Sequence, residues 1–542
     1  MKKLILPLLT SILLFASCTG ESSLRRAADT ITAEELRDYT RTLGSDSFMG
    51  RKPFTEGETV TVEYLAGELK KRGFAPAFGE SWFQSVPMVE ITSRVNGMVT
   101  VNTGREKIAL AAPDDIAVES PSMKQLVELV EIPMVFCGFG IVAPEYGWND
   151  YAGLDLKGKC AVVLVNDPGL YTGDTTLFKG REMTYYGRWT YKYEEAARQG
   201  ATAVLIVHET VGAGYDYSIP RKSSISPGLY MDQGEEEIPP CPVTGWFSAE
   251  AADRIFRASG RDVESLRSEA CSAAFKGFSM GADISMSIAN SHRRDSSRNV
   301  AGILRGSKTP EECIVVSAHW DHFGIGESEN GDSIYNGAVD NGTSMAWALE
   351  IGEAFAALRE RPARSVILFF PTAEEQGLLG SSWFVANPPV KRENIVAAFN
   401  NDLLLPLGRM KDIMITGYGQ SELDDLLTVA AARQERYIMP DPNPETGMYF
   451  RSDHFPFAQA GIPALFARGN CDSREFGKEW AAAREKEYIT TRYHKPADNY
   501  YPDMNFEGIA EDAKAIFEVG YRIVTSDIRP GWKSGSEFAN VR

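Results

Sequence analysis

The sequence has few cysteines and no excess of basic residues. Seven cysteines occur in 542 residues, and the six that follow Cys18 show neither a paired spacing nor a C-x-x-C arrangement. A disulfide framework and a cysteine-ligated zinc are therefore not expected. The formal net charge of −18 argues against nucleic acid as a partner, because its phosphates require a basic surface.

Long apolar runs are also lacking, apart from one near the start of the chain. Two lysines precede the apolar run 4–15, and Ala16-Ser17-Cys18 follows it. This run is too short to span a bilayer as a permanent helix. Residues 1–17 resemble a bacterial lipoprotein signal, which predicts export and a lipid anchor on Cys18 at the periplasmic or surface face of the cell envelope. A plain secretory signal and a buried N-terminal helix are the alternatives.

The chain as a whole has the composition of a soluble globular protein, with 43% hydrophobic and 24% charged residues. Its length favours two domains. From about Gln125, short β-branched runs separated by Gly, Pro and Asp indicate a strand-rich unit with its own core. After Asn299, candidate strands alternate with helical patterns such as Met345–Leu358, which predicts α/β layers.

The stretch "SAHWDHFG" places a histidine directly after one of these strands. Functional groups gather at the carboxyl ends of strands in such sheets, which makes His319 a candidate site residue. In extended chain Asp321 points to the same side, where it could brace the imidazole and leave the other nitrogen for a metal. Taken alone, H-x-D is weak, and a structural histidine is the alternative. We interpret His322 as scaffold, and His208 and His292 lie outside every motif.

Carboxylates occupy the corresponding positions further along the chain. Asp340 lies in a Gly-flanked turn at a helix start, where an N-cap is the alternative role. Glu374 and Glu375 follow the apolar run 366–370, and adjacent carboxylates there repel each other unless cations are bound. A solvated loop is the alternative. Asp402 follows another apolar strand in the same way.

The motif "YHKPAD" adds His494, in a Pro- and Asp-rich turn before the last helix. Two histidines and three carboxylates on separate strand ends and turns form a mixed nitrogen and oxygen ligand set. Such a set is suited to zinc.

These motifs, in this order, resemble the co-catalytic di-zinc aminopeptidases, a family that includes bacterial leucyl aminopeptidases and glutamate carboxypeptidase relatives. The resemblance covers roughly residues 299–525 and implies an α/β three-layer sandwich with a central mixed, mostly parallel sheet. The strand-rich unit resembles the protease-associated domain of that family. We therefore expect the N-terminal part of a peptidase domain over 18–110, a β-rich protease-associated insert over 111–290 and the metal-binding part of the peptidase domain over 291–542.

The resemblance also implies a role for each site residue. The five expected ligands of two zinc ions are His319 and Asp402 at one ion, Glu375 and His494 at the other, and Asp340 as the bridge. Glu374 would be the general base. Asp321 would orient His319, and the peptide bond after Asp340 would be cis.

The segment "MYFRSDHFPF" resembles the family's S-D-H segment near the specificity pocket. Ser452, Asp453 and His454 would support the site without binding metal. Tyr449 could supply a hydroxyl to the developing oxyanion, with Tyr493 and a plain core tyrosine as alternatives.

The resemblance implies an exported aminopeptidase that removes N-terminal residues from peptides by zinc-assisted attack of water, with Glu374 as base. A glutamate-releasing carboxypeptidase is the nearest alternative; its candidate groups for a substrate carboxylate are Arg451, Arg468, Arg474 and Arg492. A single-zinc glutaminyl-cyclase-like transferase and a non-catalytic binding protein are further alternatives. Loss of ligands would mark the binding protein, whereas all five ligand positions are filled here.

Overall fold

The computed structural model describes residues 22–232 and 240–539, and these divide into two compact units. The first unit comprises residues 22–86, 296–441 and 451–539, and the second comprises 87–232, 240–295 and 442–450. The expected signal over 1–17 and the lipid site at Cys18 lie outside the described residues. Within the described ranges, every helix is too short or too polar to cross a membrane.

A mixed sheet forms the centre of the first unit. Its strand order is β1-β13-β17-β14-β18-β21-β19-β20, and the four strands from β17 to β21 run parallel. The bounds are β1 (Ala75–Pro76), β13 (Phe278–Leu304), β17 (Arg364–Phe370), β14 (Thr309–Ser317), β18 (Ile395–Asn400), β21 (Ala464–Arg468), β19 (Asp412–Thr416) and β20 (Tyr437–Pro440). Every residue of β17 and β18 is buried, as expected of parallel strands covered on both faces.

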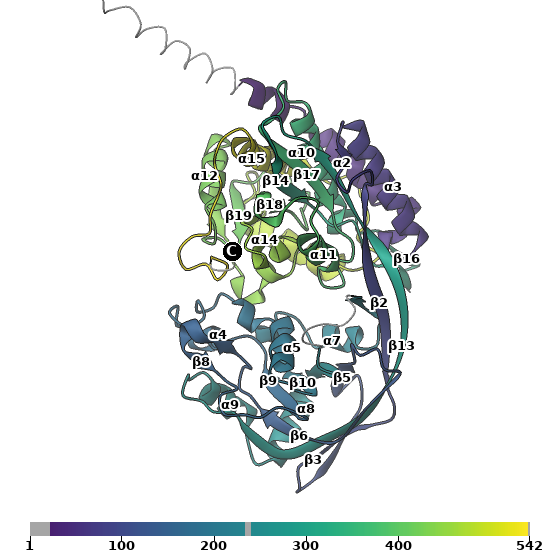
Figure 1. The fold of residues 1–542 in the computed structure, drawn as a ribbon, viewed down its shortest axis with the longest axis vertical. Helices are drawn as coiled ribbons and strands as arrows, with labels where there is room; N and C mark the ends of the chain where they lie inside the picture. The colour runs from purple at the N-terminus through teal and green to yellow at the C-terminus, as the bar shows by residue number, and fades with distance from the viewer. Residues whose placement is uncertain (1–21, 233–239, 540–542) are drawn as a thin grey trace, which may run out of the picture. The chain divides into compact units, whose positions relative to one another are not determined.

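Helices cover both faces of this sheet (Figure 1). Alternate residues of one strand enter different cores: Val366 and Leu368 pack in the larger core, while Ile367 packs with Phe384 and Phe457 on the other face. The predicted α/β three-layer arrangement is thereby confirmed. The helices are α2 (Ala33–Leu43), α3 (Glu56–Lys71), α10 (Ser344–Ala356), α11 (Leu379–Ala386), α12 (Leu423–Arg433), α13 (His454–Gln459), α14 (Gly477–Thr491) and α15 (Glu507–Val524).

Between α2 and α3 the chain makes a break, in a segment that contains Gly50 and Pro53. The helix α2 begins at its N-cap Thr32, whose side chain accepts a hydrogen bond from the amide of Glu35. The short helix η1 (Asp46–Arg51) follows and contacts the hairpin of β15 (Gly324–Glu329) and β16 (Asp332–Tyr335). This places Arg51 next to the loops that carry the candidate site.

The second unit is rich in strands and has its own cores. Its main sheet has the order β4-β3-β13-β6-β9-β10-β12-β5, and β11 pairs with β2. The strands are β2 (Phe83–Val95), β3 (Val99–Asn102), β4 (Lys107–Leu110), β5 (Ile116–Glu119), β6 (Leu126–Phe136), β7 (Val142–Ala143), β8 (Trp148–Asn149), β9 (Cys160–Leu164), β10 (Ala203–Val207), β11 (Gly228–Met231) and β12 (Val243–Phe247). The helices are α4 (Pro168–Thr172), α5 (Trp189–Arg198), α6 (Thr210–Ala213), α7 (Ser218–Ser223), α8 (Ala249–Ala258) and α9 (Val263–Ala270).

This unit begins at Pro87, earlier than the boundary expected at 111. The physical reason is strand pairing: residues 88–91 of β2 pair with β11, residues 99–102 pair with β4, and residues 100–102 also pair with β13. Its relation to the protease-associated domain stays a prediction.

Candidate metal centre

Three neighbouring parallel strands end at the candidate site. His319 follows β14, Glu374 and Glu375 follow β17, and Asp402 follows β18. Because the carboxyl ends of parallel strands meet at one edge of the sheet, these side chains converge. Two further residues join them from outside the strands. Asp340 belongs to the turn η4 (Ala338–Thr343) before α10, and His494 lies between α14 and α15.

The side chains form two groups that share Asp340. In the first group, His319 Nε2 lies 3.4 Å from Asp402 Oδ1 and 3.5 Å from Asp340 Oδ1. In the second, His494 Nε2 lies 3.2 Å from Asp340 Oδ2 and 3.3 Å from Glu375 Oε2. Two ligands bound at 2.0–2.1 Å to a tetrahedral zinc lie about 3.3 Å apart, so both groups have the spacing of a zinc ligand set.

Two buried atoms of the first group lack a hydrogen-bond partner in the part of the chain that the structure describes. His319 Nε2 and Asp402 Oδ1 are buried and have no hydrogen-bond partner among residues 22–232 and 240–539. Buried polar atoms are nearly always satisfied, so these two fit ligands of a bound cation. Glu374 Oε2, 3.8 Å from His319 Nε2, faces the same place.

Electrostatics also favour a cation here. Burial raises the pKa of Glu374 well above its usual value, and the carboxylates of Asp402 and Glu375 raise it further. Burial would lower the pKa of His319, but the carboxylates of Glu374 and Asp402 outweigh it and raise that pKa well above normal. The carboxylates of Glu375 and Asp340 likewise outweigh the partial burial of His494 and raise its pKa to about 10. The cluster therefore holds more buried negative charge than its own side chains neutralise.

The expected brace of His319 uses different atoms from those predicted. His319 Nδ1 lies 3.1 Å from the backbone carbonyl of Asp321 and 3.8 Å from its carboxylate. The carboxylate of Asp321 instead accepts hydrogen bonds from the amides of Glu374 and Glu375, at 3.0 and 3.4 Å. The course of the chain brings the backbone carbonyl of Asp321 to His319. The carboxylate of Asp321 is therefore free to bind the loop that follows β17. Asp321 thus connects two strand ends.

His322, interpreted from sequence as scaffold, contacts a site residue directly. Its Nδ1 lies 2.6 Å from Glu375 Oε1, and it can form a metal-binding group with Asp340 and Glu375. We prefer His494 as the ligand, because its Nε2 lies near a carboxylate oxygen of both residues, whereas the short contact of His322 is a hydrogen bond that holds Glu375. The peptide bond between Asp340 and Asn341 is cis, as predicted.

The S-D-H segment contributes buried polar contacts in the first unit. Ser381 Oγ donates to Asp453 Oδ1 at 2.5 Å, and Asn400 Nδ2 donates to Ser452 Oγ at 2.8 Å. His454 is buried against the ring of Phe466, with 5.0 Å between ring centroids.

The two tyrosines considered for the oxyanion lie in different units. Tyr449 belongs to the segment 442–450 of the second unit. Tyr493 stacks on the ring of His494, with 3.7 Å between centroids. The oxyanion role of Tyr449 therefore stays a prediction, and Tyr493 is the tyrosine that the first unit itself brings to the site.

Sequence reasoning missed two residues that hold the ligand loops. The buried carboxylate of Asp498 accepts hydrogen bonds from the amides of Val339 and Asp340, at 3.2 and 3.0 Å. Arg51, fully buried, donates to the carbonyls of Gly337 and Asp340 and to that of Trp320, next to His319. Burial lowers the pKa of Arg51 to about 10, so the guanidinium stays charged at neutral pH. The motif "YHKPAD" contains Asp498, so the sequence offered a signal for this residue. Arg51 stands alone in "FMGRKPF", where no signal marks it.

The histidines and carboxylates gathered at these strand ends have the chemistry and spacing of a metal-binding site. Residues 299–516 match the model of Peptidase family M28. A carboxypeptidase Q of Xenopus laevis is 27% identical over 256 residues, which cover 47% of this chain and 44% of that protein. A probable zinc metalloprotease of Pyricularia oryzae is 32% identical over 106 residues, 20% of each chain.

Among solved structures, an aminopeptidase from Aneurinibacillus sp. strain AM-1 is 18% identical with a TM-score of 0.47, covering 92% of this chain and 95% of that one. The chain spans less than half the length of the two curated relatives described above.

Proposed function

We propose that this chain is a di-zinc exopeptidase that releases N-terminal residues from peptides. The observation that carries the proposal is the pair of histidine and carboxylate groups that share Asp340 at ligand spacing, with buried atoms of the first group left unpaired among the described residues. The proposed ligands are His319 and Asp402 for one ion, Glu375 and His494 for the other, and Asp340 for both. Bound there, two zinc ions would acidify a water molecule and polarise the scissile carbonyl.

Glu374 is the proposed general base. It is almost completely buried, lies beside the first ligand group and is adjacent in sequence to a ligand of the second. From this position its carboxylate takes the proton of the attacking water and delivers it to the leaving amine. Asp321 fixes the base, because its carboxylate holds the amide of Glu374.

The charge of the site supports an aminopeptidase. Seven buried carboxylates surround or border the centre, and the buried guanidinium of Arg51 lies beside them; the seven are Asp321, Asp340, Glu374, Glu375, Asp402, Asp453 and Asp498. With two Zn²⁺ ions bound, the carboxylates still outnumber the positive charges of the ions and Arg51, and this negative surplus attracts the ammonium group of a free N-terminus and repels a C-terminal carboxylate.

One arginine favours the carboxypeptidase alternative. Arg468 ends β21, the parallel neighbour of the strand that leads to Asp402. It is buried, and its Nε and Nη1 have no hydrogen-bond partner in the described part of the chain. A buried guanidinium with unpaired donors suits a carboxylate of the substrate.

A panel of peptides separates the two activities. Peptides with a free amino group are expected to lose residues from the N-terminus, whereas N-acetylated versions of the same peptides resist cleavage. Mass spectrometry of the products identifies the end that is cut. Release of C-terminal residues from the acetylated peptides would overturn the aminopeptidase proposal and support the role of Arg468 in binding a terminal carboxylate.

Replacing Asp498 by asparagine is expected to weaken zinc binding by about 10- to 100-fold, the usual effect of removing a group that orients a metal ligand. The amide side chain offers one acceptor oxygen where the carboxylate serves the amides of Val339 and Asp340 and the hydroxyl of Tyr488. Competition with a chromophoric chelator measures the affinity. Unchanged zinc affinity would show that the turn holds Asp340 without this brace.

We also propose that the protein is exported and held at the cell envelope by a lipid on Cys18. The sequence of residues 1–18 supports this proposal. Metabolic labelling with a fatty acid is expected to mark the protein and not its Cys18→Ala variant.

A further inference from the structure

Arg51 is an unusual buried charge. It is completely buried, and its guanidinium forms no ion pair with a carboxylate in the described part of the chain. Its donors bind backbone carbonyl oxygens only: Nε binds that of Trp320 at 2.8 Å, Nη1 those of Leu43 and Asn336, and Nη2 those of Gly337 at 3.0 Å and Asp340 at 3.3 Å. Burying a charge costs free energy unless hydrogen bonds compensate, and here five acceptors do so.

The acceptors belong to the two segments that carry the proposed bridge and the first histidine. Trp320 lies between His319 and Asp321. Gly337 directly precedes the turn η4, and Asp340, the proposed bridge, belongs to that turn. The amide of His322 also donates to the carbonyl of Arg51 at 3.2 Å. One residue therefore fixes both loops through its side chain and its backbone.

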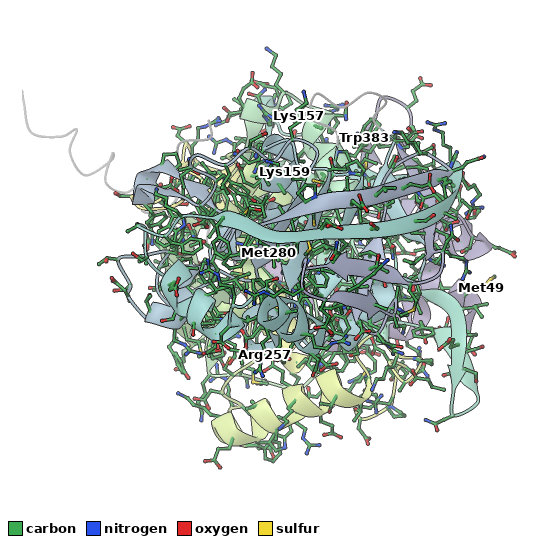
Figure 2. All side chains as sticks on the ribbon, turned by 90° about the horizontal axis from the view of Figure 1, so that it is seen from below. Met49, Lys157, Lys159, Arg257, Met280 and Trp383 are labelled. Carbon is green, nitrogen blue, oxygen red and sulfur yellow. The ribbon has the colours of Figure 1, made fainter. Side chains whose placement is uncertain are left out.

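The backbone around Arg51 is held in a conformation that side chains disfavour. Met49 and Arg51 both have φ of 51°, and Phe54 has φ of 64°. A Cβ on Gly50 would lie 2.5 Å from the carbonyl oxygen of Gly324, so the loop packs directly against the hairpin. Met49 is labelled in Figure 2. Such strained residues persist where surrounding structure over-determines them, and they cluster at functional sites.

The turn opposite is shaped to receive the guanidinium. Gly337 has φ of 55°, and a Cβ there would lie 2.7 Å from Arg51 Nη2 and 2.1 Å from the carbonyl oxygen of Asp340. Any larger residue would displace the guanidinium or the turn. The close fit makes the position of Asp340 depend on that of Arg51.

We propose that Arg51 is a positioning residue of the metal centre, which sets the separation between His319 and Asp340 by binding the backbone of both loops. The inference rests on the proposed zinc site. The positioning role and the charge of Arg51 predict opposite changes in zinc affinity when the arginine is replaced. A cation near the site repels Zn²⁺, so removal of its charge would strengthen zinc binding if electrostatics dominated. Removal of a positioning group weakens it.

The test compares Arg51→Lys, which keeps the charge without the planar fork, with Arg51→Met, which removes the charge and keeps an unbranched side chain. Zinc affinity is measured by competition with a chromophoric chelator, and the Tm of the metal-free protein is measured in parallel. Both variants are expected to bind zinc about 10- to 100-fold more weakly than the natural chain.

Arg364→Lys is the matched control. Arg364 is also buried and binds three backbone carbonyls, those of Ile523, Ser526 and Ile528, at the end of α15. Its replacement is expected to lower the Tm and to leave zinc affinity within about twofold, since it touches none of the proposed ligand loops.

The outcomes separate cleanly. Tighter zinc binding by Arg51→Met, or affinity equal to that of the natural chain in both Arg51 variants, would overturn the positioning role. If the Arg51 variants do not fold, Gly337→Ala is the second variant, because the added methyl group would disturb the contact between the guanidinium and the carbonyl of Asp340. Wild-type zinc affinity in that variant would also overturn the role. Failure of the natural chain itself to bind zinc would refute the proposed function instead.

Discussion

Replacing Glu374 by glutamine is expected to lower kcat by about 10²- to 10⁴-fold, the usual contribution of a positioned general base. Glutamine has nearly the same shape, but its amide cannot accept the proton of the attacking water. The carboxylate of Asp321 holds the backbone amide of residue 374, so the loop keeps its anchor in the variant. Because a base acts in the transition state, KM should change little while kcat falls.

The neighbouring residue provides the control for this variant. Glu375 Oε2 faces His494, and Glu375 Oε1 contacts His322, so Glu375→Gln removes a proposed ligand and not the base. Metal analysis should find the zinc content unchanged in Glu374→Gln and reduced in Glu375→Gln. Full hydrolysis by Glu374→Gln with its zinc retained would refute the assignment of the base.

The fold follows from features that a sequence displays directly. The apolar runs before His319, Glu374 and Asp402 are the parallel strands β14, β17 and β18, since fully buried strands must be continuously hydrophobic. The start of the second unit was harder to predict. The strand β2 has alternating burial and pairs with segments more than a hundred residues later in the chain, and long-range pairing leaves no local signal.

The grouping of the five proposed ligands was predictable because strand ends place most of them in order along the chain, and carboxylates are costly to bury without a partner. The residues that hold the proposed ligands in place could not be predicted from the sequence. Arg51 binds backbone oxygens, which every residue possesses, so no partner residue type accompanies it in the sequence. The contact between His319 and the carbonyl of Asp321 is invisible for the same reason. His322 and His319 look alike in "SAHWDHFG", and only the fold shows that the former reaches Glu375.

Replacing Asp340 by asparagine is expected to impair both proposed zinc sites at once. The two carboxylate oxygens of Asp340 face different histidines, at 3.5 and 3.2 Å, and an asparagine offers an oxygen to only one of them. Its amide nitrogen carries hydrogens and cannot bind a cation. Since a bound metal lowers the activation barrier by several kcal/mol, activity should fall on the order of a thousandfold.

A metal-exchange experiment distinguishes this loss from misfolding. Treatment of the natural chain with a strong chelator should abolish peptidase activity, and added Zn²⁺ should restore it. The same addition should leave Asp340→Asn inactive, with less than two zinc ions bound per chain. Asp503→Asn, at an exposed position near the C-terminal helix, should behave like the natural chain. Two zinc ions and full activity in Asp340→Asn would show that the two ligand groups do not depend on a shared carboxylate.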